Sequence, residues 1–334
     1  MAAIGVLGAG TWGMALARML CNMGHTVQVW SALPEEIDML MAEGRHPKLA
    51  HMEIPRALGY TKSLQEACAD KDILLFAVPS VFVRSTARAA CPHIADGQVI
   101  VDVAKGIESG SLFTMTQVIR DELSHRQELS GMRLVALSGP THAEEVAVDL
   151  PTTIVAACED LEAARLVQSI FMNPKFRVYT NDDIHGVEIC GAFKNIIALG
   201  TGIARGLGYG DNTAAALITR GIREVSRLGE LMGCKPDTFN GLAGIGDLIV
   251  TCTSRHSRNL TCGMLLGQGK GKEEAIREVG MVVEGIYALD AAMELKNKYQ
   301  AELPICEAVD AVVNQGTSAL EVGEALMGRM GRME

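Results

Sequence analysis

A lysine inside an apolar stretch is the first candidate for chemistry. Residues 187–202 predict a helix that is apolar on nearly every side, and Lys194 lies within it. The residues one helical turn away are Cys190, Ile197 and Ala198, so no carboxylate on the same helix face pairs with the lysine. Such a lysine either extends its stem to water or is held in a pocket to transfer protons. The rest of the chain has to decide between these two readings.

Two later segments supply groups that such a lysine requires. Asp247 lies between the glycine-rich residues 241–246 and the apolar residues 248–250. A carboxylate in that setting usually has a partner, and a lysine is a natural one. Residues 251–259 concentrate hydroxyls, two arginines and an amide, and arginine offers an oxyanion a planar, charge-assisted fork. By itself such a segment is more often a solvated loop.

A glycine pattern near the start of the chain predicts a dinucleotide site. The apolar residues 4–7 lead into G-x-G-x-x-G, and helix-forming residues 14–23 follow. In this context Gly8 allows the tight turn, Gly10 lets the backbone approach a pyrophosphate, and Gly13 lets helix and strand pack closely. The start of the helix offers its N–H groups to the phosphates.

The segment that should read the adenosine ribose leaves the cofactor open. A second strand is expected over 26–30, and residues 31–34 read Ser-Ala-Leu-Pro, with neither an acid for a 2′-OH nor an arginine for a 2′-phosphate. Glu35 and Glu36 lie deeper, in the expected first turn of the next helix, where the helix dipole favours carboxylates anyway. The choice between NAD and NADP is therefore not settled, and the absence of arginine favours NADH.

Alternating strands and helices predict an α/β fold for the first part of the chain. Further strands are expected over 73–78, 99–103, 134–137, 153–156 and 176–179. With helices between most of them, they predict a doubly wound parallel sheet, whose ligands bind beyond the carboxyl ends of the strands. Pro79, Lys105 and the segment 139–141 occupy such ends.

The strand signal stops near Asp183. We therefore expect a Rossmann domain over 1–183 and an all-α domain over 184–334, broken by glycines at 200–210, 241–246 and 267–271. In the helical part, Asp211 and Asn212 are expected to cap a helix over 213–227.

Composition and charge limit the classes of partner. The chain has 334 residues, 48% hydrophobic and 21% charged, with a formal charge of −10, which is typical of a soluble enzyme of two domains. That charge argues against nucleic acid and gives no attraction to anionic membranes. Nine scattered cysteines predict reduced thiols and no metal site. Without a signal segment or an apolar run near ~18 residues, we expect a cytoplasmic protein with no membrane insertion.

Taken together, these segments resemble the bacterial-type NAD(P)-dependent glycerol-3-phosphate dehydrogenases, from Gly5 to about Ala288. The motifs that carry the resemblance are Gly-Ala-Phe-Lys-Asn-Ile-Ile-Ala at 191–198, Gly-Leu-Gly-Tyr-Gly-Asp-Asn at 206–212, Gly-Leu-Ala-Gly-Ile-Gly-Asp-Leu at 241–248, Thr-Cys-Thr-Ser at 251–254, Ser-Arg-Asn at 257–259 and Val-Val-Glu-Gly at 282–285. The resemblance also implies a helical second domain like the C-terminal domain of 6-phosphogluconate dehydrogenase.

The resemblance assigns roles residue by residue. It implies Lys194 as the catalytic acid/base, with Lys105 at the substrate and Asp247 beside the lysine. The residues it implies at the substrate are Lys105, Gly139, Thr141, Lys194, Asp247, Ser257, Arg258 and Asn259. The residues expected at the NAD or NADP cofactor are Gly8, Gly10, Thr11, Trp12, Gly13, Ser31, Pro79, Lys105, Ala143, Arg258, Val282 and Glu284.

The chain departs from the family pattern at three places. Ala32 stands where the family often has an arginine, which argues against a strong preference for NADPH. Thr141-His142 replaces the usual Ser-Phe, so the hydroxyl is kept, and we assign His142 no role. Residues 49–52 also differ from the usual Tyr-Leu-Pro-Gly.

The resemblance implies a reversible hydride transfer that reduces dihydroxyacetone phosphate to sn-glycerol 3-phosphate and supplies glycerophospholipid synthesis. The helical, Met-rich second domain suits a homodimer. Two alternatives stay open: a β-hydroxyacid or ketopantoate-type reductase, which recognises a carboxylate, and a non-enzymatic NAD-binding redox sensor. A sensor has no need of Lys105, Lys194, Asp247 and Arg258 together.

Overall fold

The computed structural model describes residues 1–129 and 131–331, which form two compact units. The first unit comprises Met1–Lys105 and Phe113–Glu188, and the second comprises Gly106–Leu112 and the chain from Ile189 onward. The expected domain boundary at residue 183 stays a prediction. Gly106–Leu112 belongs to the second unit because Glu294 accepts hydrogen bonds from the Ser109 hydroxyl and the Gly110 N–H, and Ile107 enters the core of that unit.

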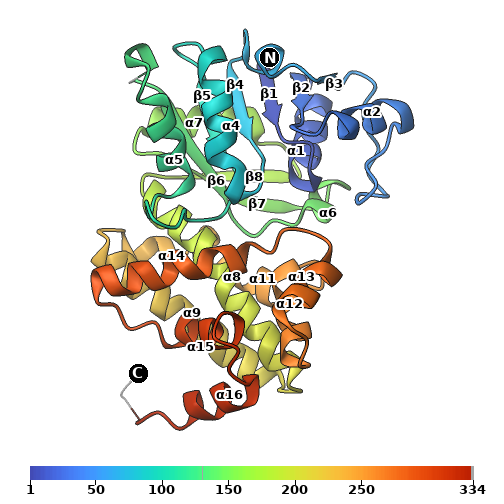
Figure 1. Cartoon of the computed structure of the whole chain (residues 1–334). Helices are drawn as coiled ribbons and strands as arrows, with labels where there is room; N and C mark the ends of the chain where they lie inside the picture. Colours follow the sequence, from blue (N-terminus) through green and yellow to red (C-terminus); the bar gives the residue numbers. More distant parts are fainter. Residues whose placement is uncertain (130, 332–334) are drawn as a thin grey trace. The chain divides into compact units, whose positions relative to one another are not determined.

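A single twisted sheet organises the first unit (Figure 1). Its strands follow the order β3-β2-β1-β4-β5-β6-β7-β8. Their bounds are β1 (Ala3–Leu7), β2 (Thr26–Trp30), β3 (Gly59–Thr61), β4 (Ile73–Phe76), β5 (Val99–Asp102), β6 (Arg133–Ser138), β7 (Thr152–Ala157) and β8 (Phe176–Asn181). The chain order reverses beside β1, and such a point in a doubly wound sheet leaves a crevice at the carboxyl ends of the strands.

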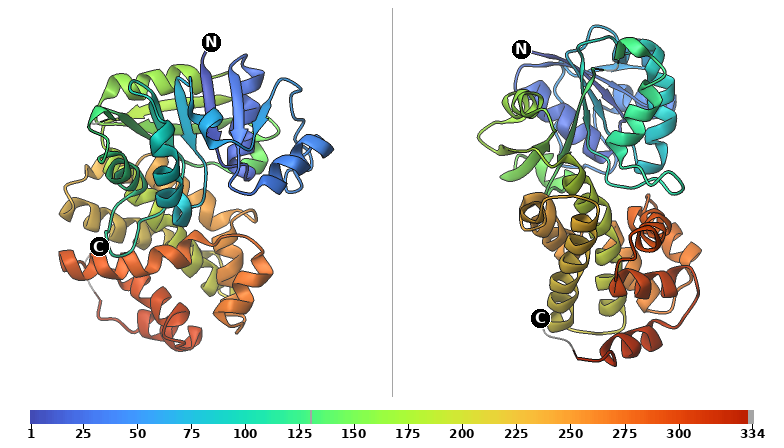
Figure 2. Two further views of the ribbon diagram at one scale, coloured as in Figure 1. Left: turned by 45° about the horizontal axis from the view of Figure 1, so that its top comes forward. Right: turned by 90° about the vertical axis from the view of Figure 1, so that its left-hand side faces the viewer.

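Helices cover both faces of this sheet, because successive side chains along each strand point to opposite faces and both sets are apolar. Leu75 and Val101 point into one core, whereas their neighbours Leu74 and Ile100 point into the other. The first core contains α1 (Thr11–Asn22), α2 (Pro34–Glu43), α6 (Ala143–Val146) and α7 (Leu161–Phe171). The second contains α3 (Leu64–Cys68), α4 (Val83–Ala90) and α5 (Met115–Leu123), and Figure 2 shows α4 and α5 on one side of the sheet. Short 3-10 turns are η1 (Ser80–Phe82), η2 (Cys91–His93) and η3 (Gln127–Leu129).

The sheet differs from the expected one in two ways. β3 was not predicted, because a strand of three residues is too short to show a pattern. β7 runs antiparallel to β6, so the sheet is not wholly parallel as predicted. Between Ser138 and Thr152 the connection holds only the four-residue α6, whereas parallel strands are usually joined by a longer helix that crosses the face of the sheet.

The second unit is helical and is built around α8 (Ile184–Gly206). The other elements are α9 (Asp211–Leu231), α10 (Pro236–Phe239), the π-helical turn η4 (Leu242–Gly246), α11 (Asp247–Thr253), α12 (Arg258–Gly267), α13 (Lys272–Val279), α14 (Glu284–Tyr299), α15 (Pro304–Val313) and α16 (Ala319–Met327). In the described residues, α8 alone is long and apolar enough to cross a membrane. Its most apolar window is wholly buried in the protein, as expected of a core helix.

Two expectations for the helical part were wrong. Gly200 and Gly202 do not break a helix, since α8 continues to Gly206. A Cβ at Gly202 would lie 2.2 Å from the Leu260 carbonyl oxygen and 2.9 Å from the Gly263 Cα, so Gly202 and Gly263 let α8 and α12 pack backbone against backbone. Asp211 does not cap α9; it is the first helical residue, and its carboxylate lies 3.4 Å from the Arg205 guanidinium.

Candidate active site

Lys194 lies in the core of the second unit with its charge paired. The side chain is 8% exposed, and its Nζ lies 2.5 Å from Asp247 Oδ1, whose side chain is fully buried. Nζ also donates to Thr251 Oγ1 at 2.8 Å. The Thr251 hydroxyl in turn donates to the Asp247 carbonyl oxygen at 2.6 Å, so its lone pair faces the ammonium. The lysine is therefore held in a polar cluster and does not extend to water.

The glycine-rich turn η4 delivers Asp247 to this position. The backbone at Gly244 is non-helical, and a Cβ there would lie 2.1 Å from the Phe239 carbonyl oxygen, so only glycine fits. This close wrap ends at Asp247, the first residue of α11, where the helix dipole favours a carboxylate. Thr251 follows four residues later on the same helix face. Burial raises the pKa of the neighbouring Cys252 thiol to about 12, so no thiolate competes for the lysine.

A second polar network joins three helices beside Lys194. Asn259 of α12 donates from Nδ2 to Asn195 Oδ1 at 2.9 Å. Its Oδ1 accepts the Gly285 N–H, also at 2.9 Å, at the start of α14. The Asn195 amide donates to the Gly191 carbonyl oxygen at 3.1 Å. Asn259 thus ties the segment that contains Val282 and Glu284 to the helix that carries Lys194, and its expected role at the substrate stays a prediction.

The neighbouring residues of the Ser-Arg-Asn motif differ in environment. Ser257 is buried, and its hydroxyl caps α12 by accepting the Leu260 N–H at 3.2 Å. Arg258 is exposed, and within residues 1–129 and 131–331 it makes no hydrogen bond or ion pair. The structure therefore gives Ser257 a capping role and leaves the Arg258 guanidinium available to an anion.

The glycine turn of the first unit has the geometry that its spacing predicts. Gly8 has φ +126°, and a Cβ there would lie 2.6 Å from the Ala77 carbonyl oxygen. A Cβ at Gly13 would lie 2.2 Å from the Gly8 carbonyl oxygen, whereas one at Gly10 would meet nothing within 4 Å. Gly8 and Gly13 thus close the turn, and the space beside Gly10 is open. Thr11 and Trp12 form the first turn of α1, which has no side-chain cap and no acidic residue.

Lys105 and the segment after β6 lie together in the first unit. Lys105 Nζ donates to the Gly139 carbonyl oxygen at 3.1 Å, and the Thr141 hydroxyl donates to the same oxygen at 3.1 Å. Pro79 follows β4 at the same edge of the sheet, and Ala143 begins α6. The structure therefore brings Lys105, Gly139 and Thr141 into contact, as predicted for residues at the ends of β5 and β6.

Sequence reasoning did not predict the contacts of three polar residues. Thr251 could have been found from its spacing of four residues after Asp247. Asn195 adjoins Lys194, yet nothing in the sequence names Asn259 as its partner. The third is Glu36. Residues 31–34 at the end of β2 contain no acid, but the Ser31 hydroxyl donates to Glu36 Oε2 at 2.6 Å, so the Glu36 carboxylate lies beside the strand end.

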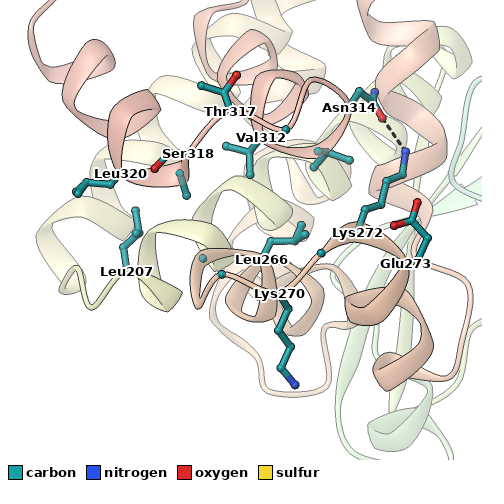
Figure 3. A pocket seen from close by; sticks show the side chains of 16 residues that line it. Leu207, Leu266, Lys270, Lys272, Glu273, Val312, Asn314, Thr317, Ser318 and Leu320 are labelled. Carbon is teal, nitrogen blue, oxygen red and sulfur yellow. Dashed lines mark hydrogen bonds between the residues drawn. The ribbon is translucent and has the colours of Figure 1, made fainter.

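Two cavities of the second unit lie away from these clusters. One, of about 590 Å³, is lined by the ends of α8 and α12, the start of α13 and the loop before α16. Figure 3 shows its Lys272 side chain bonded to Asn314. Another, of about 790 Å³, lies beneath α16 between α8, α9 and α15. Neither is lined by a residue that we predicted at the substrate or cofactor.

Comparisons with known proteins agree with this geometry. Residues 3–164 match the family model for the NAD-dependent glycerol-3-phosphate dehydrogenase N-terminus, and residues 183–324 match that for the C-terminus. A protein named glycerol-3-phosphate dehydrogenase (NAD(P)+) 2, from Lactobacillus delbrueckii subsp. bulgaricus, is 62% identical over 100% of this chain and 99% of its own. A relative with the same enzyme name, from Agathobacter rectalis, is 48% identical over 100% of this chain and 98% of its own.

A solved structure is also similar throughout. The crystal structure of glycerol-3-phosphate dehydrogenase from Coxiella burnetii has a TM-score of 0.93 at 35% identity, covering 98% of this chain and 99% of that one. The glycine turn, the buried lysine cluster and these full-length likenesses agree. This chain belongs to the NAD-dependent glycerol-3-phosphate dehydrogenase family.

Proposed function

We propose that the chain is an NAD(P)-dependent sn-glycerol-3-phosphate dehydrogenase, which reversibly reduces dihydroxyacetone phosphate to sn-glycerol 3-phosphate. The observation that carries the proposal is the buried cluster of Lys194, Asp247 and Thr251 in a chain that matches this family from residue 3 to residue 324. Burying a lysine and its carboxylate partner removes both charges from water, which costs folding free energy. A role in chemistry is a reason for a protein to retain such a pair.

The first unit fits a dinucleotide. Any residue other than glycine at position 10 would place its side chain in the open space beside the turn. The N–H groups of the first turn of α1 face no side-chain cap and no carboxylate from that turn. Both features suit a pyrophosphate at a helix N-terminus. When bound, the nicotinamide supplies or accepts the hydride.

The chemistry left to the protein is proton transfer and charge stabilisation at the substrate oxygen. In the reducing direction we assign Lys194 Nζ to donate a proton to the C2 carbonyl oxygen, and in the oxidising direction to remove it from the C2 hydroxyl. Asp247 and Thr251 hold the ammonium at 2.5 and 2.8 Å, which fixes its position before the reaction. Lys105 is assigned to the substrate as a second cation.

The phosphate end of the substrate requires a separate anchor. Arg258 is proposed for this role because its guanidinium is exposed and unpaired within the described residues. An anchor at the non-reacting end uses binding energy to place C2 for the reaction. Asn259 supports this anchor from its network with Asn195 and Gly285.

The rival classes predict different substrates. A β-hydroxyacid or ketopantoate-type reductase would oxidise the reduced cofactor with a carboxylate substrate, and a redox sensor would bind the cofactor without turnover. Initial rates of NADH and NADPH oxidation with dihydroxyacetone phosphate, ketopantoate and unphosphorylated dihydroxyacetone separate all three. The proposal expects turnover with the phosphate ester and is refuted if ketopantoate is preferred or if no substrate is reduced.

We further propose a cytoplasmic location, a homodimer and a role in supplying glycerol 3-phosphate for glycerophospholipids. The nine cysteines support a reducing compartment, since all are buried and none is in a disulfide. Sedimentation equilibrium measures the oligomeric state directly.

A further inference from the structure

A carboxylate is held at the end of β2, where the sequence has no acid. The Ser31 hydroxyl donates to Glu36 Oε2 at 2.6 Å and accepts the Leu33 N–H at 3.1 Å. Since the N–H occupies the acceptor side, the hydroxyl proton points at Glu36. Ser31 is buried directly after Trp30, so the first turn of α2 is folded back and fixes the carboxylate beside the strand end.

This carboxylate lies close to the glycine turn. The Gly8 N–H donates to the Trp30 carbonyl oxygen at 2.8 Å, which joins the turn to the end of β2. On the other side, the buried His46 ring makes a hydrogen bond to the Ala9 backbone and interacts electrostatically with Glu36. Glu36, Ser31 and His46 therefore form one cluster around the turn that we assign to the dinucleotide.

The charge of this cluster is dominated by Glu36. Burial lowers the pKa of His46, and its Nδ1 accepts the Lys48 N–H at 3.2 Å, so the ring is neutral at pH 7. Arg45 lies 3.1 Å from Glu43, which balances its charge. Lys48 adds a positive charge from the exposed loop after α2. Within the described residues, Ser31 is the sole hydrogen-bond partner of the Glu36 carboxylate, which leaves acceptor capacity for a ligand.

We propose that Glu36, positioned by Ser31, makes this chain select NADH over NADPH. A carboxylate at the end of the second strand accepts a hydrogen bond from the ribose 2′-OH and repels a 2′-phosphate. Here that carboxylate comes from the first turn of the following helix. The inference rests on the proposed function only in requiring that a dinucleotide binds at the glycine turn.

The expected effect follows from the charges. Like charges about 6 Å apart in a partly solvated site change an affinity by about tenfold. The Kd of NADPH should therefore exceed that of NADH by tenfold or more in the wild-type protein. Glu36→Gln keeps an acceptor for Ser31 and removes the charge, so it should lower the ratio of the two Kd values by about tenfold.

The test is equilibrium titration of the full chain with NADH and NADPH, read by nicotinamide fluorescence. AMP and its 2′-phosphate derivative, read by calorimetry, isolate the adenosine end from the reacting end. Glu35→Gln is the matched control: it removes an equal charge from the same helix turn, and Glu35 makes no hydrogen bond to Ser31. It should leave the ratio of the two Kd values within about twofold of the wild type.

If the wild-type Kd values for NADH and NADPH lie within twofold of each other, the inference is overturned, and this result does not depend on whether Glu36→Gln folds. Equal effects of Glu36→Gln and Glu35→Gln also overturn it. Rapid reduction of dihydroxyacetone phosphate with both cofactors would then leave the proposed function intact. Binding of neither dinucleotide refutes the proposed function and this inference together.

Discussion

The pairing of Lys194 with Asp247 makes a strong prediction about stability. The carboxylate is fully buried and the lysine is 8% exposed, so removing either partner leaves the other charge in the core without its ion-pair partner. Breaking a buried ion pair in this way costs about 3–5 kcal/mol, whereas replacing both partners by apolar residues is often neutral or better. Asp247→Ala and Lys194→Met should each destabilise the fold strongly, and the double variant should cost much less than their sum.

The magnitude is measurable by thermal unfolding. For a domain of about 150–250 residues, 1 kcal/mol shifts Tm by roughly 2–4 °C, so each single variant should lower Tm by roughly 6–20 °C. The double-mutant cycle should return a coupling free energy of about 2 kcal/mol or more.

The chain also offers a matched control. Lys62 and Asp38 form a 2.6 Å ion pair whose side chains are about half exposed, and Asp38→Ala should cost less than about 1 kcal/mol. Circular dichroism and scanning calorimetry on the four cycle members and this control decide the matter. Costs for Asp247→Ala no larger than those for Asp38→Ala, or additive effects in the cycle, would refute the reasoning.

Two further predictions concern substrate binding and pH. Arg258→Ala should raise the KM for dihydroxyacetone phosphate by roughly 30–160-fold through loss of a charged hydrogen bond worth about 2–3 kcal/mol. Arg255→Ala, which removes a nearby exposed arginine, should change KM little, and equal effects in steady-state kinetics would contradict the anchor. Glu224 is buried, accepts the Ile305 N–H at 3.0 Å, and has its pKa raised by burial to about 8. Because its pKa is higher in the folded protein, the free energy of unfolding should fall as pH rises from about 4.5 to about 8, and urea titrations should show this fall reduced in Glu224→Gln.

Local sequence patterns predicted those parts of the site that depend on neighbouring residues. The spacing of Gly8, Gly10 and Gly13 specifies the turn because each glycine answers a backbone requirement within the same strand–turn–helix unit. Lys194 and Asp247 are each a charge in an apolar stretch, and burial forces such charges to find partners, so the sequence predicts a partner for each. That the two lie beside each other is what the family resemblance implies, and the structure shows their ion pair.

Other features depend on contacts that no local pattern shows. The sequence does not predict that Glu36 lies at the end of β2, because residues 32–35 do not specify the direction in which the chain turns to bring Glu36 against Ser31. The role of Asn259 at the substrate stays a prediction, and no local pattern shows that its amide also bridges α8 and α14. The sequence alone predicts a helix break at Gly202, because the α12 residues that require a glycine there, Leu260 and Gly263, are distant in sequence.

We propose that Lys194 transfers the proton to and from the substrate oxygen. The most direct measurement is the turnover of NADH with dihydroxyacetone phosphate by Lys194→Ala, with cofactor affinity measured on the same folded sample. We predict that kcat falls by about 10³-fold or more while the Kd of NADH changes less than about threefold, because the glycine turn lies in the first unit. Lys298→Ala, at an exposed lysine of α14, should match the wild type. Turnover within tenfold of the wild type, or loss of NADH binding in folded Lys194→Ala, would contradict the account.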